Sequence, residues 1–264
     1  MMSASPKTAL VTGASAGIGY ELSKVFAREG YSLVLVARNE ARLREVAEEI
    51  QRANGAAVKV IAKDLCITSA TDELFAELQH DSIVIDVLVN NAGFGTYGPF
   101  AQSDLNSQLD MIKLNVLSLT HLARLFLPGM IERRNGHIMN VASTAAFQPG
   151  PLTAVYYATK AYVLSFSEAI SNELEGSGVT VSALCPGPTV SEFQKRAQLE
   201  GVRLVKGAMM DAATVAESGY RGMIQNKRLV IPGWKNRLLA FSVRFIPRSI
   251  VLRVARKLQS KAEA

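Results

Sequence analysis

A glycine-rich segment near the start of the chain, residues 12–19, constrains the fold most strongly. It follows a short apolar run at 8–12 and precedes residues 20–28, where apolar side chains recur at helical spacing until Gly30. Glycines at positions 13, 17 and 19 permit a sharp turn and close packing of the helix. They also let the backbone approach a phosphate, which the free N–H groups of a helix N-terminus attract. The segment therefore predicts a strand, a phosphate-binding turn and a helix.

Apolar runs of strand length then alternate with amphipathic helical segments, which is typical of an α/β fold. Further strands are expected at 32–38, 57–62, 85–89, 138–142, 179–184 and 229–232, and helices at 40–53, 69–79, 103–127 and 211–224. With 264 residues, 48% of them hydrophobic, the chain suits one such domain better than two. Ligands in these folds bind outside the carboxyl ends of the strands where the strand order reverses, here between strands one and four.

The end of the second strand indicates which dinucleotide the turn would hold. An acidic residue about 20 positions beyond the glycines hydrogen-bonds the ribose of NAD, whereas a nearby Arg accommodates the 2′-phosphate of NADP. Here the strand ends in Ala37 and Arg38, and a guanidinium can bind a phosphate through two parallel hydrogen bonds. We therefore predict NADP(H) rather than NAD(H). The preference is modest, because Ala16 adds no second basic contact from the turn.

Tyr156 and Lys160 are the candidates for chemistry, because a helix places residues four positions apart on one face. A phenol ionises near pH ~10, outside the range in which acid–base catalysis is efficient. An ammonium about 4 Å away would stabilise the phenolate by roughly 4 kcal/mol, or about 3 pKa units. Tyr157, three positions before Lys160, fits the same geometry, so spacing alone leaves two candidate tyrosines.

Other motifs accompany this pair in a fixed order. They are the glycine segment, Asn90-Asn91-Ala92-Gly93, Asn115, Ser143 at the end of a buried strand, and Pro186-Gly187. As a set they resemble the short-chain dehydrogenase/reductase family over nearly the whole chain. The resemblance implies a single doubly wound Rossmann domain, with a mostly parallel seven-stranded sheet of order 3-2-1-4-5-6-7 and helices on both faces. It also implies hydride transfer between the C4 atom of a nicotinamide and a carbonyl or alcohol.

The resemblance gives each motif a role. Tyr156, selected by the family's Tyr-x-x-x-Lys spacing, is the general acid/base, and Lys160 lowers its pKa and holds the nicotinamide ribose. Ser143 binds the substrate oxygen, and Asn115 holds a water that links Lys160 to solvent. The expected cofactor contacts are Gly13, Ser15, Gly17, Ile18, Gly19, Arg38, Asp64, Leu65, Asn91, Tyr156, Lys160, Pro186, Gly187 and Thr189. Residues 191–206 would be an amphipathic lid over the substrate, or else an ordinary surface helix.

Positive charge is concentrated at the C-terminal end of the chain. The net charge is +6, but residues 227–264 hold ten Lys/Arg and one acid, so the preceding 226 residues carry −3. This distribution argues against a nucleic-acid groove in the catalytic domain. Residues 233–264 extend the domain of residues 1–232 and mix aromatic and aliphatic side chains with arginines. Such an extension could bind a membrane surface or an acyl-rich substrate. Alternatively, it could pack on the body of the domain or on a second subunit, with the guanidinium groups of its arginines in water.

The remaining features narrow the partners and the location. No apolar run of signal-peptide length precedes the first strand, and residues 138–159 are too polar to span a membrane, so we expect a cytoplasmic protein. The histidines lack metal-ligand spacing, and we expect no metal. The expected substrate is a small, apolar carbonyl or hydroxyl compound. The apolar faces of the helices that carry Asn115 and Tyr156 match those through which the family forms homodimers or homotetramers.

Two other functions stay open at this point. The same fold could serve as a catalytically idle, NADP(H)-responsive binding or scaffold protein, although such a protein has no need of Ser143 or Asn115. The basic extension could instead direct an active enzyme to lipid or sterol carbonyls at a membrane.

Overall fold

One parallel sheet organises the structure, a computed structural model that describes residues 6–197, 201–203 and 209–261. Its seven strands are β1 (Thr8–Thr12), β2 (Ser32–Ala37), β3 (Val58–Ala62), β4 (Val87–Asn90), β5 (Gly136–Val141), β6 (Val179–Leu184) and β7 (Leu229–Val230). They lie in the order β3-β2-β1-β4-β5-β6-β7, and each neighbouring pair is parallel. The predicted doubly wound sheet and its strand order are confirmed.

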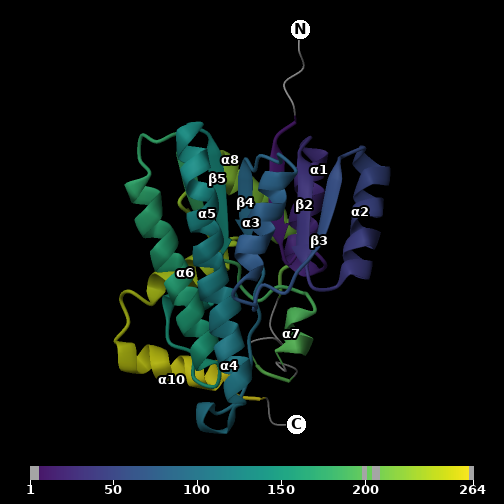
Figure 1. Ribbon diagram of the computed structural model, residues 1–264. Coiled ribbons are helices and arrows are strands. Elements are labelled where there is room, and N and C mark those ends of the chain that lie inside the picture. The colour runs from purple at the N-terminus through teal and green to yellow at the C-terminus, as the bar shows by residue number, and fades with distance from the viewer. Residues whose placement is uncertain (1–5, 198–200, 204–208, 262–264) are drawn as a thin grey trace.

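Helices cover both faces of this sheet (Figure 1). The described α-helices are α1 (Gly17–Arg28), α2 (Glu40–Asn54), α3 (Ala70–His80), α4 (Leu105–Ile112), α5 (Leu119–Glu132), α6 (Ala154–Glu173), α7 (Phe193–Arg196), α8 (Ala212–Ile224), α9 (Trp234–Ser242) and α10 (Arg248–Gln259). The buried side chains of α1, α2 and α8 form one core on one face, and those of α3 and α5 form a second core on the other. The fold is therefore a three-layer α/β/α arrangement.

The alternation of side chains along a strand explains why the strands are apolar throughout. In β1, Ala9 and Val11 belong to the core beneath α1, whereas Leu10 belongs to the core beneath α3 and α5. The side chains of all three are fully buried. A strand covered on both faces needs apolar residues at consecutive positions, which is what the sequence shows.

The prediction of one continuous α-helix at 103–127 is wrong, because the helix is interrupted. The structure has α4, a π-helical stretch at Lys113–Ser118, and α5, which runs on to Glu132. Together they form Leu105–Glu132, a described segment long and apolar enough to cross a membrane by length and composition alone. Core helices of soluble proteins share these properties, and the inner face of α5 packs on β4 and β5.

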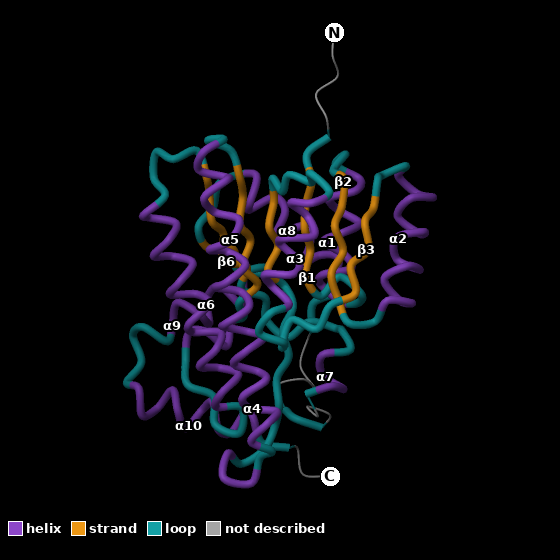
Figure 2. The backbone as a smooth tube through the Cα atoms, viewed as in Figure 1, coloured by secondary structure: helices purple, strands orange, loops and turns teal. Residues whose placement is uncertain are grey.

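The C-terminal helices lie at the end of the molecule where the strands finish. Figures 1 and 2 show α10 crossing beside α4 and α6, at the opposite end from the N-terminus. Ala240 of α9 joins a third core cluster with Val163 of α6 and Cys185 after β6. Val251, Ala255 and Gln259 form the buried stripe of α10. The extension therefore packs on the body, one of the arrangements that the sequence left open.

Candidate active site

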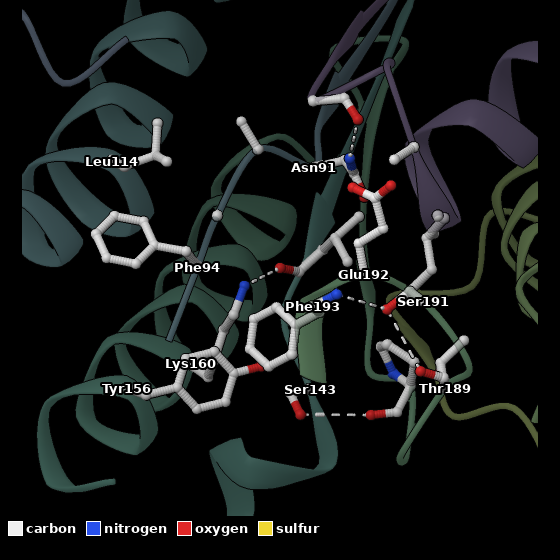
Figure 3. Close-up of a pocket in the computed structure, with 18 of the residues that line it drawn as sticks. Asn91, Phe94, Leu114, Ser143, Tyr156, Lys160, Thr189, Ser191, Glu192 and Phe193 are labelled. Carbon is white, nitrogen blue, oxygen red and sulfur yellow. Dashed lines mark hydrogen bonds between the residues drawn. The ribbon is translucent and has the colours of Figure 1, made fainter. Parts of the chain in front are cut away.

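A cavity of about 400 Å³ opens at the carboxyl ends of the strands (Figure 3). Fourteen of the sixteen predicted site residues line it: Gly13, Ser15, Gly17, Ile18, Arg38, Asp64, Leu65, Asn91, Ser143, Tyr156, Lys160, Pro186, Gly187 and Thr189. The other two, Gly19 and Asn115, lie directly behind the lining. Motifs far apart in the sequence thus meet at the strand-order reversal between β1 and β4.

The glycine turn at one end of the cavity leaves no room for side chains. Gly13 and Gly17 have φ angles of 65° and 56°, in the left-handed region that favours glycine. A Cβ atom on Gly19 would lie 2.3 Å from the carbonyl oxygen of Gly13. Asn91, at the end of β4, donates from Nδ2 to the carbonyl oxygens of Thr12 (2.8 Å) and Gly13 (3.2 Å). The turn is fixed with its backbone open to the cavity, which fits the pyrophosphate of a dinucleotide.

Two basic residues line the cavity beside the glycine turn. Arg38, directly after β2, has a side chain that is 69% exposed, and its Nη1 lies 3.9 Å from Oδ2 of Asp64. Lys63, directly after β3, donates a 2.8 Å hydrogen bond to Glu73. Lys63 is not among the residues predicted from the sequence. Its only signal was its place at a strand end, one residue before the predicted Asp64.

At the other end of the cavity, α6 presents Tyr156 and Lys160 one turn apart (Figure 3). The Lys160 side chain is buried, and its Nζ donates a 2.8 Å hydrogen bond to the carbonyl oxygen of Val141, the last residue of β5. The same Nζ lies 5.8 Å from the centre of the Tyr156 ring. The sheet therefore fixes the ammonium group beside the phenol.

Burial dominates the acid–base properties of this pair. It raises the pKa of Tyr156 above its ordinary value, and a hydrogen bond with Ser143 opposes that rise. It lowers the pKa of Lys160 to about 8, because an ammonium is poorly solvated there. We expected Lys160 to bring the pKa of Tyr156 toward neutrality. In this structure burial raises that pKa instead, and the Nζ atom donates to the carbonyl oxygen of Val141 rather than to the Tyr156 hydroxyl.

Ser143 lies two residues beyond β5 and begins the 3-10 turn Thr144–Phe147. Its hydroxyl accepts a 3.1 Å hydrogen bond from the N–H of Ala145 and donates to the carbonyl oxygen of Pro186 at 3.4 Å. The Ser143 and Tyr156 side chains both line this part of the cavity, and Ser143 opposes the rise in the pKa of Tyr156. A carbonyl oxygen placed there can accept a hydrogen bond from each hydroxyl.

The structure separates the two candidate tyrosines. The hydroxyl of Tyr157 accepts a 2.5 Å hydrogen bond from Nε2 of Gln259, in α10. Its ring fills the space over Gly150, where a Cβ atom would lie 2.2 Å from the ring. Tyr157 is thus committed to packing, while Tyr156 lies beside Ser143 and Lys160. This geometry favours Tyr156 as the acid/base.

Asn115 lies inside the π-helical stretch and behind the cavity wall. Its Nδ2 donates to the carbonyl oxygen of Phe94 (2.9 Å) and to Oγ1 of Thr159 (3.1 Å), and its Oδ1 accepts from the N–H of Phe94 (3.1 Å). A Cβ atom on Gly93 would lie 2.9 Å from this Oδ1 and 3.5 Å from Nζ of Lys160. Asn115 thus supports the loop segment after β4 that contains Gly93 and Phe94 and that lies between it and Lys160.

The loop after β6 closes a third side of the cavity. Thr189 donates from Oγ1 to the carbonyl oxygen of Gly187 at 2.9 Å and pairs through its backbone with Met210. Asn236 of α9 packs so closely on Gly187 that a Cβ atom there would lie 2.5 Å from its carboxamide. The C-terminal extension therefore supports this loop from behind.

The predicted lid at 191–206 is described only in part. Residues 198–200 and 204–208, which include Leu199 and Leu204, lie outside the described residues. Within the described part, the ring of Phe193 in α7 lies 5.3 Å from the ring of Tyr156, and Val202 is buried. Phe193 therefore covers the tyrosine side of the cavity.

Several lining residues are not among the sixteen predicted site residues. They include Phe94, Leu114, Gln148, Tyr157, Phe193 and Gln259. Most of these side chains are apolar or aromatic, and the two glutamines are the exceptions. The wall around the candidate acid is therefore mainly apolar, with a few polar groups placed in it.

Comparison with known families gives a match over most of the chain. The family model described as short chain dehydrogenase matches residues 7–200. A short chain dehydrogenase of Pseudocercospora fijiensis is 37% identical over 189 residues, which cover 71% of this chain and 61% of that protein. The ketoacyl reductase HetN of Nostoc is 37% identical over 181 residues, 69% of this chain and 63% of that protein. The chain thus spans less than two thirds of the length of these two relatives.

Solved structures resemble the whole fold. A short-chain dehydrogenase from Sphingobium yanoikuyae in complex with NADPH is 32% identical, with a TM-score of 0.82, covering 90% of this chain and 93% of that one. The bulky-bulky ketone specific alcohol dehydrogenase from Comamonas testosteroni is 29% identical, with a TM-score of 0.78, covering 92% and 93%.

Proposed function

The chain belongs to the short-chain dehydrogenase family, and on that premise we propose that it is an NADP(H)-dependent oxidoreductase that interconverts a carbonyl compound and an alcohol. One observation carries the proposal. The Tyr156 hydroxyl lies with Ser143 and Lys160 at one end of a cavity whose other end is the glycine turn. An acid/base and a dinucleotide cradle in one cavity are the two parts that such a reaction requires.

A bound nicotinamide dinucleotide would supply or accept the hydride. The glycine turn and Asn91 would hold its phosphates and adenosine ribose, and Asp64 and Leu65 its adenine. Pro186, Gly187 and Thr189 would hold the nicotinamide end, with Lys160 at the adjoining ribose. The close packing of Gly19 against the carbonyl oxygen of Gly13 supports the phosphate site at the glycine turn. No side chain fits at this point, so the backbone of the turn stays accessible to a phosphate.

The preference for NADP(H) rests on charge beside the glycine turn. Arg38 follows β2 where an acidic residue would bind the ribose hydroxyl of NAD, and Lys63 adds a second cation to the same wall. Both already have acidic neighbours, Asp64 and Glu73. A 2′-phosphate would compete with these carboxylates for the two cations.

In the reduction, the protein's part is to bind the carbonyl oxygen and protonate it. Ser143 and Tyr156 would each donate a hydrogen bond to that oxygen, and Tyr156 would transfer its proton as the carbonyl carbon receives the hydride. The raised pKa of Tyr156 keeps the proton in place until negative charge develops on the substrate. The Lys160 ammonium would then stabilise the phenolate that remains. The product is an alcohol, and the reverse reaction follows the same steps backward.

The mainly apolar lining supports a bulky, apolar ketone as substrate. Phe193 lies against the Tyr156 ring in this lining, and Phe94 and Leu114 line the cavity farther from it. The names of the Comamonas and Nostoc relatives, a bulky-ketone dehydrogenase and a ketoacyl reductase, also indicate carbonyl substrates. A cavity of about 400 Å³ accommodates a ligand of this kind.

Replacing Tyr156 by Phe tests the proposal. The variant keeps the ring but lacks the proton, so reduction should fall at least about 100-fold while NADPH binding stays nearly unchanged. NADPH oxidation with a panel of aldehydes, ketones and diones measures turnover, and cofactor fluorescence measures binding. Tyr162→Phe, an exposed tyrosine of the same helix, is the matched control. Normal turnover in Tyr156→Phe would refute the role of this residue, and a wild-type protein that binds NADPH but reduces nothing would support the idle binding protein instead.

We also propose that α4 to α6 form a contact between copies of this chain. Leu109, Ile112 and Leu117 are 43–49% exposed on α4 and the stretch that follows, and Tyr162 of α6 is 40% exposed. A run of large apolar side chains is typical of an interface. Light scattering after size-exclusion chromatography should give the molar mass of a dimer or tetramer. Leu117→Glu should lower that molar mass toward the value of the monomer.

A membrane contact through the extension is supported by a different observation. Trp234 and Phe245 are 71% and 84% exposed, and exposed arginines, Arg237 and Arg244 among them, lie beside them in sequence. Aromatic and cationic side chains together favour an anionic lipid surface, which would bring lipid or sterol carbonyls within reach. The cytoplasm is the predicted location in either case.

Co-sedimentation with phosphatidylserine vesicles tests this contact in the full-length chain. The double variant Trp234→Ser, Phe245→Ser should stay in the supernatant when the wild type pellets. Val84→Ser, an exposed apolar residue at the opposite end of the sheet, should pellet like the wild type. Equal pelleting of the double variant and the wild type would exclude the contact. Truncation after Pro232 is a poorer test, because it also removes Gln259 from the cavity wall.

A further inference from the structure

The last turn of α10 places a buried amide in the wall of the active-site cavity. Val251, Ala255 and Gln259 recur every four residues along the inner face of this helix. Two of them are apolar, but Gln259 is polar and only 2% exposed. It is also the member of this stripe that lines the cavity. A glutamine in such a place needs partners for both ends of its carboxamide.

Three segments hold Gln259 in position. Its Nε2 donates to the hydroxyl of Tyr157 at 2.5 Å, and its backbone carbonyl accepts from the hydroxyl of Tyr97 at 2.8 Å. The N–H of Arg203 donates to the carbonyl oxygen of Ser260 at 3.1 Å, which ties the residue after Gln259 to the short described segment at 201–203. The side chain is therefore held by Tyr157, the residue that follows the candidate acid Tyr156 in the sequence.

The other end of the carboxamide has no partner within the protein. Oε1 of Gln259 is buried and makes no hydrogen bond with any residue that the structure describes. A buried acceptor without a donor destabilises the state that contains it. The oxygen itself exposes almost no surface to the cavity that Gln259 lines, so a ligand would have to turn the carboxamide toward it. A ligand that did so and brought a donor to the oxygen would remove the penalty, so the unpaired oxygen favours such a ligand.

We propose that Gln259 is a specificity-determining residue that binds a hydroxyl group of the substrate, separate from the carbonyl that reacts. The substrate class is then an apolar ketone that carries a second, remote hydroxyl, or the corresponding diol in the reverse reaction. A hydroxyl suits the site because it both donates and accepts, and so pairs with either end of an amide. The inference rests on the proposed reductase function and adds the substrate class to it.

Matched ketones test the proposal, because they differ only at the remote group. The probes are para-hydroxypropiophenone and para-methylpropiophenone, the corresponding meta pair, and para-hydroxybenzylacetone with para-methylbenzylacetone. For the wild type we expect the hydroxyl member of at least one pair to have a kcat/KM about tenfold higher. Gln259→Met, which keeps the length of the side chain without its polar end, should reduce that ratio to about one by loss on the hydroxyl member alone.

Tyr97→Phe controls for the position of the helix. It removes the other side-chain hydrogen bond to residue 259 but keeps the carboxamide, so the preference for the hydroxyl should survive. Absence of any preference in the wild type, or an undiminished preference in Gln259→Met, would overturn the proposal while leaving the reductase function intact. Loss of the preference in Tyr97→Phe to the same degree would also overturn it, in favour of a role for the helix position. Failure of the wild type to reduce any of the six ketones would instead contradict the proposed function itself.

Discussion

The carboxamide of Asn115 and the backbone of Phe94 exchange two hydrogen bonds, one of 2.9 Å from Nδ2 to the carbonyl oxygen and one of 3.1 Å from the N–H to Oδ1. The side chain thus acts as a neighbouring strand would, on a segment that has left the sheet after β4. The helix that carries it widens into a π-helical stretch at Lys113–Ser118. Such stretches inside α-helices are frequent at functional sites.

Replacing Asn115 by Ala should therefore destabilise the protein as well as reduce its activity. Both backbone groups of Phe94 lose their partner, and each unpaired group costs about 1–3 kcal/mol if it stays buried. We expect a clear fall in the free energy of unfolding measured with urea. Asn106→Ala, on the exposed face of α4, should change it by less than about 0.5 kcal/mol. Equal stability of the two variants would contradict the structural part of this role.

A single methyl group on Gly19 should disrupt the glycine turn. The new Cβ would lie 2.3 Å from the carbonyl oxygen of Gly13 and 2.4 Å from Nδ2 of Asn91. The Gly13 oxygen belongs to the backbone, so it cannot move aside without distorting the turn. We expect Gly19→Ala to lose about 1–3 kcal/mol of stability and most of its NADPH binding. Cofactor fluorescence and thermal unfolding measure the two effects.

Gly129→Ala is the matched control for this substitution. Gly129 is helical and its added Cβ would meet only the end of the flexible Arg133 side chain, at 3.1 Å. The control should be as stable as the wild type or gain up to about 1 kcal/mol, because alanine favours the helix. Full NADPH binding by Gly19→Ala would show that the turn adapts and that its tight contacts are not required.

Replacing Arg38 by Glu should reverse the cofactor preference. The change removes a cation that can bind a 2′-phosphate and puts a carboxylate where it can accept from the ribose hydroxyls of NAD. We expect the KM for NADPH to rise about 100-fold and that for NADH to fall. Arg44→Glu makes the same charge change at an equally exposed position outside the cavity, and should leave both values near those of the wild type. An unchanged ratio in Arg38→Glu would remove this residue from the cofactor site.

The sheet and most of the site followed from the sequence because their signals are local. A strand covered on both faces is apolar at consecutive positions, and a turn that excludes side chains contains glycine. For these reasons β1 and the turn after it could be predicted from the sequence alone. The Tyr156 to Lys160 spacing is likewise fixed by the helix that carries it.

The parts that sequence reasoning missed depend on contacts between distant segments. The apolar pattern around Asn115 is that of a continuous α-helix, whereas the π-helical stretch contains an asparagine that hydrogen-bonds Phe94, 21 residues away. Gln259 reaches Tyr157 across 102 residues, because α10 folds back beneath α6. The acid–base balance of Tyr156 and Lys160 depends on burial, which residue spacing alone does not reveal.

The final prediction concerns how cofactor binding changes with pH. Burial lowers the pKa of Lys160 to about 8, and the one ionisable neighbour that acts on it among the described residues, Cys185, stays a neutral thiol because burial raises its pKa to about 12. Below pH 8 the ammonium can donate charge-assisted hydrogen bonds to the nicotinamide ribose; above it, the neutral amine binds more weakly. The affinity for NADPH should therefore fall as pH rises through about 8, by about tenfold in total.

Lys160→Arg separates this effect from other causes. A guanidinium stays charged across the whole range, so the variant should show no step near pH 8, whatever its affinity. Because NADPH binds the protonated form more tightly, it must in turn raise the pKa of Lys160, and the alkaline limb of kcat should lie at higher pH than that of kcat/KM. Fluorescence titrations with NADPH from pH 6.5 to 9.5 provide the measurement, in a range chosen to span about 1.5 units on either side of the pKa. A step of the same size in Lys160→Arg would assign the titration to another group, and a flat wild-type profile would show that the ammonium does not reach the cofactor.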